Sequence, residues 1–405
     1  MKILYLLQDL PYPLTNGVRV KVFNLISYMT KSHECHIVSF GDEDLHARAL
    51  ALQQKVPGVR VLNLYPLCSG LQLQLSRLAY FVRGKPVFLA RWHDKGFAKT
   101  VRQILKTTQY DVIHLDALAM APYVRLCQSI PTVISTTDAV SLAQSRRAQT
   151  MRISIHKIYR LLASWSTAHL EQRMLPLFTK VHVVSKPDRD YLRARIPTAH
   201  IECIEHVVPD EVLQYADDNP YTLSCRRRIL FMGSLRRDAV AAGLLAFLSL
   251  VYPIIWEAFS DLEMIVLGGT PPVNIRRQVE NTPGVRIVEW VDDYCAEIMK
   301  AQVIVCLDVA GTGIKTRVLY ALALGKPIVA SSAALEGIDV RDGVHCFEHK
   351  LDKGFAECVL ALLKDENLRH KIGQNAKKFI AENYNMRMSG AKWTKLYESA
   401  MAAHA

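Results

Sequence analysis

The stretch that decides the fold is VIVCLDVAGTGIKTRVLYALALGKPIVASS, from Val303 to Ser332. It opens on an apolar run, 303–307, passes through a loop of small residues, 310–313, and continues as a helical pattern over 314–324. Gly-Lys-Pro then ends the helix, and a second apolar run follows. This order predicts a strand, a loop, a helix and a second strand, and about 30 residues is the usual length of such a unit.

The loop in the middle of this unit has the features of an anion site. Gly311 and Gly313 lie where backbone N–H groups at a helix N-terminus are free, and Lys315 and Arg317 add positive charge in the expected first turn. Because such groups bind phosphate, the sequence predicts a pyrophosphate site here. A tight turn in an ordinary crossover connection is the alternative explanation of the two glycines.

The same stretch resembles the donor-nucleotide motif of GT-B glycosyltransferases of the retaining, glycogen-synthase-like type (family four), especially a branch associated with bacterial exopolysaccharides. The resemblance implies an α/β fold, GT-B, with two Rossmann-like β/α/β domains facing a central cleft. Relatives have two glutamates that contact the donor sugar and the ribose, and Thr312 and Tyr320 stand in their places. The donor contacts that the resemblance implies in this motif are Gly311, Thr312, Gly313, Ile314, Lys315 and Tyr320.

A chain of 405 residues suits two domains. Alternating strand and helix patterns over 1–208 predict an N-terminal Rossmann-like acceptor domain, and the alternation restarts over 226–384 as a donor-nucleotide domain. Between them, 209–225 loses hydrophobic periodicity and is expected to be a linker. The resemblance implies that the last helix, 385–405, returns to the N-terminal domain.

Two positions of the N-terminal domain are candidate site residues. Gly17 follows the first strand and matches a cleft glycine of the family, and a turn glycine is the alternative. Asp138 follows a strand at 131–135, and ligands of open α/β sheets bind at that end of the strands, so we assign it to the acceptor. A helix N-cap is its alternative. His114, inside an apolar strand, is expected to be a hydrogen-bonded core residue.

Two further loops of the second domain are expected at the donor. Ser234 stands where relatives have an arginine, and Arg236 and Arg237 are the nearest substitutes, with plain surface charge as the alternative. Trp290 and Val291 follow a strand where the family holds the nucleobase. Trp290 is expected either to stack on the base or to close the core.

The resemblance implies a hexosyl- or glycosyltransferase (EC 2.4) that retains the anomeric configuration and needs neither a metal nor another cofactor. Such transfer depends on stabilising the departing diphosphate more than on a strong base. We therefore expect Lys315 and Asp138 to be the catalytic residues, Lys315 at the leaving group and Asp138 at the acceptor hydroxyl.

The net charge of +12 calls for an anionic partner. The segment 141–180 has seven Lys or Arg residues and a single acid, Glu171, and 71–82 is an amphipathic pattern with leucines at helical spacing. An anionic membrane surface or a lipid-linked acceptor fits this pattern. Nucleic acid does not, because no recognition motif accompanies the charge. A solvated helix face and an ordinary packing helix are the alternatives.

No run of 18 uncharged apolar residues is present, the chain starts directly on a strand pattern, and nine scattered cysteines never form C-x-x-C. We therefore expect a cytoplasmic protein. The positive charge suggests that it could also bind peripherally to the inner face of the membrane. The expected function is sugar transfer from a nucleotide-diphosphate sugar in polysaccharide or glycoconjugate biosynthesis. The competing hypothesis is a catalytically silent subunit of the same fold that binds a nucleotide or a partner enzyme, because both family glutamates are absent.

Overall fold

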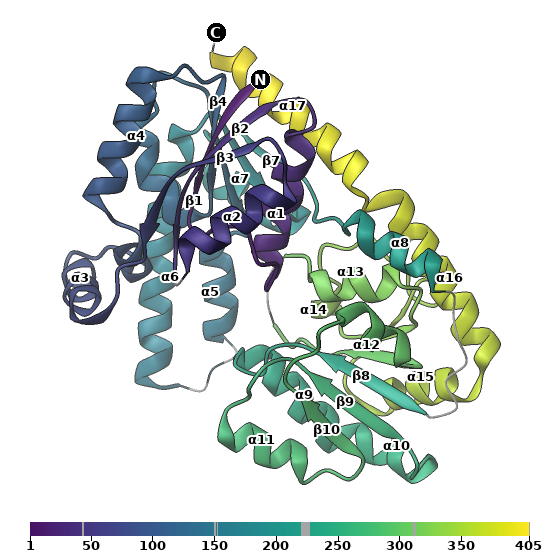
Figure 1. The fold of residues 1–405 in the computed structure, drawn as a ribbon. Helices are drawn as coiled ribbons and strands as arrows, with labels where there is room; N and C mark the ends of the chain where they lie inside the picture. Colours follow the sequence, from purple (N-terminus) through teal and green to yellow (C-terminus); the bar gives the residue numbers. More distant parts are fainter. Residues whose placement is uncertain (43, 150, 152, 220–226, 311–312, 405) are drawn as a thin grey trace. The chain divides into compact units, whose positions relative to one another are not determined.

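The computed structural model describes residues 1–42, 44–149, 151, 153–219, 227–310 and 313–404. The chain divides into two compact units, one formed by Met1–Glu205 with Arg387–Ala405, and the other by His206–Met386. Each unit is built on one parallel sheet with helices packed on its faces, so the expected α/β class is confirmed (Figure 1).

The first unit contains a seven-stranded sheet in the order β3-β2-β1-β4-β5-β6-β7. Its strands are β1 (Lys2–Leu7), β2 (Glu34–Gly41), β3 (Val59–Pro66), β4 (Val112–Asp116), β5 (Thr132–Thr137), β6 (Lys180–Val183) and β7 (Ile201–Cys203). Its helices are α1 (Gly17–Met29), α2 (Leu45–Lys55), α3 (Gly70–Val82), η1 (Val87–Arg91), α4 (Lys95–Thr107), η2 (Leu118–Leu126), α5 (Val140–Gln149), α6 (Ile155–Met174), η3 (Leu175–Leu177), α7 (Lys186–Arg195) and α17 (Met386–His404).

The second unit contains a six-stranded sheet in the order β10-β9-β8-β11-β12-β13. Its strands are β8 (Arg228–Met232), β9 (Glu263–Leu267), β10 (Val285–Val288), β11 (Val303–Cys306), β12 (Ile328–Ala330) and β13 (Phe347–Glu348). Its helices are α8 (Asp210–Asp218), α9 (Asp238–Leu250), α10 (Tyr252–Ala258), α11 (Val273–Glu280), α12 (Tyr294–Lys300), α13 (Thr316–Ala323), α14 (Ser332–Leu335), α15 (Lys353–Lys364) and α16 (Glu366–Asn383).

Both faces of each sheet are covered, which explains why the strands are apolar without alternation. In β1, Leu4 and Leu6 belong to the core on one face of the sheet, while Ile3 and Tyr5 belong to the core on the other. Because successive side chains of a strand point to opposite faces, a continuous apolar run is what a doubly covered strand requires.

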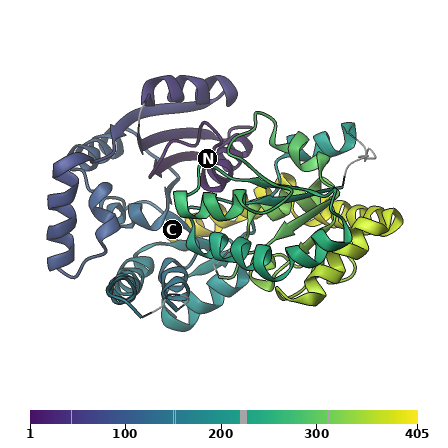
Figure 2. The same ribbon diagram turned by 90° about the horizontal axis from the view of Figure 1, so that it is seen from below.

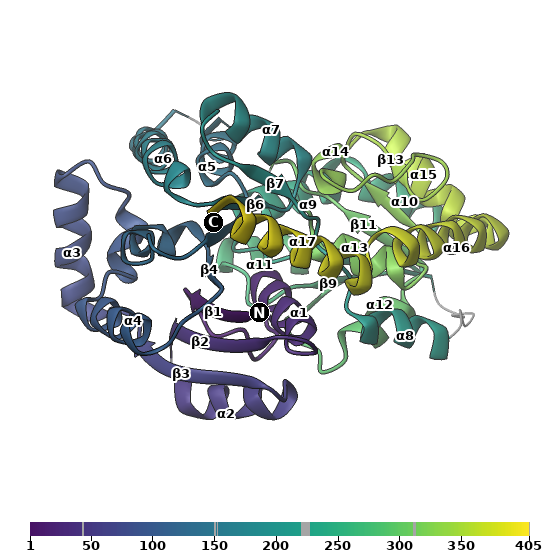
Figure 3. The same cartoon turned by 90° about the horizontal axis from the view of Figure 1, so that it is seen from above.

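The C-terminal helix α17 lies against the sheet of the first unit (Figure 3). The hydroxyl of Tyr397 is 2.9 Å from Nδ1 of His114 in β4, and the ring of Trp393 packs on His182 in β6. His114 is fully buried, and burial lowers its pKa, so the expectation of a hydrogen-bonded core histidine is confirmed.

The segment 209–225 does not begin as the expected linker, because helix α8 occupies Asp210–Asp218. Val212 and Ala216 lie four residues apart on α8 and are buried in the core of the second unit. The pair is too short to produce a clear helical pattern among the acidic residues of this segment. Asp210 and Glu211 nevertheless favour the helix, because acidic side chains in the first turn stabilise it.

The helical pattern over 240–259 is interrupted at Pro253, a residue that cannot continue a helix. Helix α9 ends at Leu250, α10 starts at Tyr252, and the two are bent by 45°. By length and composition this bent pair could cross a bilayer, while no single helix of the described residues could. Six apolar residues of the pair are buried in the core of the second unit, namely Val240, Ala241, Leu244, Phe247, Tyr252 and Ile255.

The central stretch forms β11, α13 and β12, as its pattern predicts. The helix starts at Thr316, two residues later than expected, because Lys315 has extended backbone angles and serves as the N-cap residue. At the other end Gly325 adopts φ +69°, a left-handed conformation that suits glycine, and thereby closes the helix.

Candidate active site

Two of the loops that carry candidate donor residues follow neighbouring strands, β8 and β11, of the second sheet. The strand order reverses between β8 and β11, since β9 and β10 lie on one side of this pair and β12 and β13 on the other. In an open parallel sheet, the carboxyl ends of the strands at such a reversal form the usual binding crevice. The loops after β8 and β11 therefore stand where a ligand is expected.

Glycines let the backbone segments at this point approach each other closely. A Cβ atom at position 268, just after β9, would lie 2.1 Å from the carbonyl oxygen of Gly233, just after β8. A Cβ at position 243 in α9 would lie 1.6 Å from the carbonyl oxygen of Leu307, just after β11. Neither position can accept a side chain without moving backbone, so main chain packs directly on main chain beside the strand reversal.

A buried ion pair stands beside this reversal. The guanidinium of Arg317, in the first turn of α13, donates from Nη2 to Oδ2 of Asp308, which follows β11. Burial alone would lower the pKa of Arg317, but the Asp308 carboxylate outweighs it and the pKa is raised. Among the described residues, the buried Nε of Arg317 has no hydrogen-bond partner. A buried donor without a partner is uncommon in folded proteins, and this one lies beside the strand reversal.

Lys315 is the second cation at the start of α13. Its residue is only 7% exposed, and its ammonium donates to the carbonyl oxygen of Gly313 at 2.8 Å. Gly313 has φ +70°, a conformation that favours glycine. The side chain thus turns back to the loop instead of extending into solvent. Gly311 and Thr312, two of the expected donor contacts, lie outside the described residues.

The other expected donor residues of this motif face the interior more than solvent. Ile314 is buried in the core of the unit, and Tyr320 is half-buried with its ring edge-on to Tyr294, at 6.3 Å between centroids. Burial raises the pKa of Tyr320, so its hydroxyl stays protonated at neutral pH.

The loop after β8 is open to solvent. Ser234, Arg236 and Arg237 are all exposed, and Arg236 donates from Nε to the carbonyl oxygen of Thr270 at 3.0 Å. Arg237 is the N-cap residue of α9 and makes no side-chain capping bond. Both arginines follow a strand that borders the crevice, so their position suits an anion site as well as plain surface charge.

After β10, Trp290 and Val291 differ in exposure. Val291 packs against the core, whereas Trp290 is 72% exposed. The alternative in which Trp290 closes the core is therefore wrong. Stacking of the exposed indole on a base stays a prediction.

The first sheet has a comparable reversal between β1 and β4, and a buried lysine spans it. The ammonium of Lys21 in α1 donates to Oδ1 of Asp116 at the end of β4, at 2.7 Å. It also donates to Ser135 at 2.8 Å and to Thr137 at 2.7 Å, both in β5. Burial would raise the pKa of Asp116, but Lys21 and His114 together hold it below its ordinary value.

Asp138 follows β5 directly after Thr137, which has φ +69°, and its side chain is partly exposed. The network of Lys21 ends one residue before it, so Asp138 lies at the rim of a buried polar cluster. Lys21 was noticeable in the sequence only as a basic neighbour of Gly17. Its three acceptors are 95 to 116 residues away, which no local pattern reveals.

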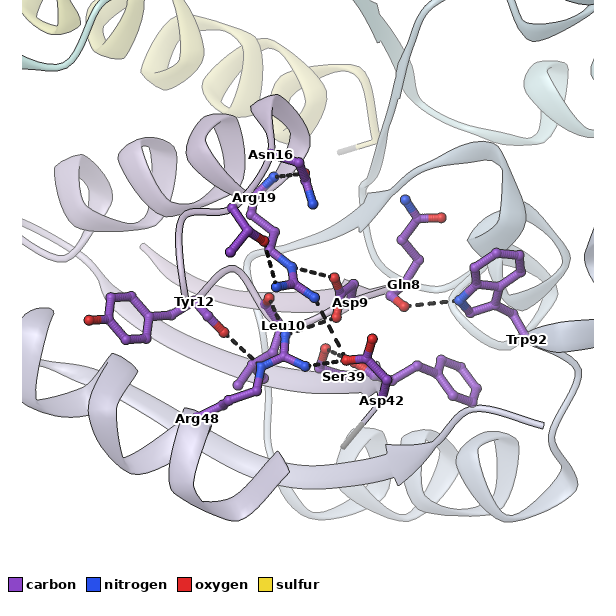
Figure 4. A network of polar contacts seen from close by, with 12 residues as sticks. Gln8, Asp9, Leu10, Tyr12, Asn16, Arg19, Ser39, Asp42, Arg48 and Trp92 are labelled. Carbon is purple, nitrogen blue, oxygen red and sulfur yellow. Dashed lines mark hydrogen bonds and ion pairs between the residues drawn. The ribbon is translucent and has the colours of Figure 1, made fainter. Parts of the chain in front are cut away.

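Gly17 is the first residue of α1, and the loop before it is held by a polar network (Figure 4). The guanidinium of Arg19 donates to Asp9 at 2.6 Å, and that of Arg48 donates to Asp9 at 3.0 Å and to Asp42 at 2.5 Å. The charges of both arginines are thus balanced inside the protein. They position the loop that carries Gly17 and add little free positive charge to it.

No group of three or more His, Cys, Asp or Glu side chains in the described part of the chain is arranged to hold a metal ion. Asp293, which follows Asp292 in the sequence, caps α12 by accepting from the backbone N–H of Ala296 at 2.8 Å. Its place at a helix N-terminus accounts for this carboxylate without a metal.

Comparison with known proteins places both units in families. The model of "Glycosyltransferase Family 4" matches residues 15–212, and that of "Glycosyl transferases group 1" matches residues 226–365. A curated relative, an uncharacterized glycosyltransferase of Methanocaldococcus jannaschii, is 35% identical over 92 residues. That match spans 22% of this chain and 23% of the relative.

Solved structures resemble the whole chain. Sucrose-phosphate synthase of Thermosynechococcus elongatus has a TM-score of 0.71 at 16% identity and covers 100% of both chains. A glycosyltransferase of Rickettsia africae has a TM-score of 0.68 at 14% identity, over 99% of this chain and 98% of that one. Anabaena HepE in complex with UDP has a TM-score of 0.64 at 13% identity, over 98% of this chain and 100% of that one. At these identities the likeness establishes the fold.

The two family models cover most of both units, and the motif after β11 that resembles the family lies within one of them. The chain therefore belongs to the family-four type of glycosyltransferases with the GT-B fold.

Proposed function

We propose that the protein transfers a sugar from a nucleotide-diphosphate sugar to an acceptor hydroxyl, with retention at the anomeric carbon and without a metal ion. The observation that carries the proposal is the buried ammonium of Lys315 at the N-terminus of α13, beside the Arg317–Asp308 ion pair and the strand reversal of the second sheet. Buried positive charge at that place fits a diphosphate better than it fits a neutral ligand.

In this proposal three kinds of group stabilise the leaving diphosphate. Lys315 supplies an ammonium, the Nε of Arg317 supplies an N–H, and the loop with Gly311, Thr312 and Gly313 supplies backbone donors. Asp308 keeps Arg317 charged and oriented, since its carboxylate accepts a hydrogen bond from Nη2 of the guanidinium. These fixed charges act on negative charge that grows as the glycosidic bond breaks, which is the requirement for catalysis by preorganised electrostatics.

The remaining donor contacts follow the loops around the crevice. Arg236 and Arg237 approach the phosphates from the loop after β8, and Trp290 stacks on the base. The other proposed donor contacts are Gly17, Ser234, Val291, Ile314 and Tyr320.

The acceptor is assigned to the first unit. Asp138 is proposed to orient or deprotonate the acceptor hydroxyl from the rim of the Lys21 cluster, because it follows the carboxyl end of a parallel strand. We further propose that the acceptor is a precursor of a polysaccharide or glycoconjugate, linked to a lipid, and that the protein acts in the cytoplasm at the inner face of the membrane. The basic segment 141–180 supports this part of the proposal.

The nucleotide is tested first by thermal shift with UDP, GDP, ADP, CMP and dTDP. UDP is the first candidate, because HepE, a structural neighbour, was solved with UDP and with UDP-glucose. A ligand at 100 times its dissociation constant stabilises the folded state by about 2.7 kcal/mol, so the correct diphosphate raises the melting temperature clearly. No shift with any of the five nucleotides would refute the donor site.

Turnover is then measured with sugar donors of the nucleotide that binds, with and without EDTA, and the anomeric configuration of the product is read by NMR. Retention and equal rates in EDTA are expected. Lys315→Ala should reduce turnover strongly, while Lys300→Ala, which changes an exposed lysine of the same unit, should not. Tight nucleotide binding without turnover of any donor would instead indicate a catalytically silent subunit.

A further inference from the structure

Helix α6 of the first unit turns a stripe of large apolar side chains to solvent. Its buried positions include Ser164, Thr167 and Glu171. The residues turned to solvent, between 52% and 85% exposed, are Ile155, Ile158, Leu162 and Trp165. They recur at spacings of three and four, so they form one stripe along the helix. A surface helix normally buries such a stripe against the core.

Helix α3 repeats the pattern. Only Leu73 of this helix is buried. The leucine stripe that the sequence predicts is instead between 60% and 76% exposed at Leu71, Leu75, Leu78 and Val82. The alternative of an ordinary packing helix is therefore wrong for this stripe. α3 lies at the edge of the first unit, away from the sheet (Figures 2 and 3).

The two stripes lie on neighbouring helices, because α3 and α6 contact each other. The rings of Phe81 in α3 and Tyr159 in α6 are 6.3 Å apart between centroids. Phe81 and Tyr159 are themselves exposed. We call this surface, with the eight stripe residues named above, the α3/α6 face. An exposed apolar surface that extends over two helices is the kind of feature that marks a docking site.

Charge around the face has one sign. Arg77 lies in α3, Lys157 and Arg160 lie in α6, and Arg146 and Arg147 lie in the adjoining α5. Among the described residues of these three helices, Glu171 is the acidic residue, and it is buried. Its carboxylate accepts hydrogen bonds from the backbone N–H of Ser141 at 3.0 Å and from the Ser141 hydroxyl at 2.5 Å. The described residues of the three helices therefore present no carboxylate to solvent.

Apolar and aromatic side chains on helices whose exposed charges are cationic match an anionic bilayer. Isoleucine, leucine and tryptophan side chains enter the boundary between headgroups and acyl chains, and lysine and arginine extend to lipid phosphates. A second copy of the chain is a poorer occupant, because a symmetric contact would place one cationic border against another.

We propose that the α3/α6 face docks the first unit on an anionic lipid surface, with Trp165 and the leucines of α3 inserted. This proposal identifies the surface responsible for the membrane association proposed above. It rests on the proposed function only for the reason why the protein would bind a membrane. Vesicle binding is measured without a sugar nucleotide, so the two can fail separately.

The test is flotation of the full chain with vesicles of phosphatidylcholine alone or with about one third phosphatidylglycerol, at low and high salt. Binding is expected with the anionic vesicles, weaker at high salt, and absent with phosphatidylcholine alone. Leu75→Glu combined with Leu162→Glu should weaken binding on the order of 100-fold, because two charged groups would have to enter the apolar layer. Leu50→Glu, at a leucine of α2 that is 62% exposed, is the matched control and should bind like the parent.

Fluorescence provides a second readout. Trp165 emission should shift to the blue on binding, and Trp165→Phe should lose that shift while it still floats with the vesicles. The melting temperature with and without UDP checks that the variants are folded and that the nucleotide site is unaffected. Absence of vesicle binding, equal flotation of the double variant, or a dimer that the double variant abolishes would each overturn the proposal.

Discussion

Lys315→Ala is the perturbation that most directly tests the proposed diphosphate site. Two unit charges about 4 Å apart interact by about 4 kcal/mol at an effective dielectric constant of about 20, which is suitable for a site that is buried but close to the surface. Only the part of this energy that grows as the leaving group gains charge lowers the barrier. A loss of about 2.7 kcal/mol, or about 100-fold in kcat, is the scale found for removing one preorganised contact.

The fold should survive this change. Lys315 donates to the Gly313 carbonyl oxygen at 2.8 Å, and losing one such bond costs about 1 kcal/mol. The assay is steady-state transfer on the donor that the thermal shift identifies, with kcat and KM determined separately and circular dichroism to check folding. Lys300→Ala, which removes an exposed lysine paired with Glu297 at 2.8 Å, should keep parental kcat. Parental turnover of Lys315→Ala on the correct donor would refute the role of this ammonium.

Three further changes test other parts of the structure. Asp308→Asn leaves the Arg317 guanidinium buried without its counter-charge and should cost about 3 kcal/mol of unfolding free energy in urea titrations, whereas a stability equal to the parent would contradict the ion pair. Tyr320→Phe should raise the nucleotide dissociation constant several-fold, about 1 kcal/mol by calorimetry, and unchanged affinity would leave Tyr320 a packing role only. Burial raises the pKa of Glu171 from 4.5 to about 6, so the folded state holds this proton more tightly than the unfolded state and loses stability as pH rises between these values. Glu171→Gln should therefore gain about 2 kcal/mol relative to the parent between pH 4 and pH 7, and an equal difference at both pH values would exclude a raised pKa.

Local patterns in the sequence were sufficient for the α/β architecture. The apolar strand runs, the restart of the strand and helix alternation in the second half, and the helix break at Pro253 are all present in the structure. They could be predicted because a strand that is covered on both faces, a proline and a capping glycine each act through their nearest neighbours in the chain. Helix α8 was not predicted, because only two of its residues, Val212 and Ala216, are buried and the residues around them are largely polar or acidic.

The polar chemistry of the site was decided by the tertiary structure. The sequence pointed to Lys315 but not to its burial, and Asp308 attracted no attention until the fold placed it on Arg317. Lys21 lies in α1, the helix that follows β1, and it contacts Asp116 of β4 because β1 and β4 are neighbours in the sheet. The charge state of a buried group depends on partners that come from distant segments, and sequence spacing does not contain that information.

The α3/α6 face illustrates the same division. The helical spacing of Leu71, Leu75, Leu78 and Val82 was legible in the sequence, and it predicts a helix with one apolar side. Whether that side faces the core or solvent depends on what the rest of the chain packs against it. The sequence determined which residues share a face, and the tertiary structure alone determined that this face stays exposed, because burial is a property of the whole folded chain.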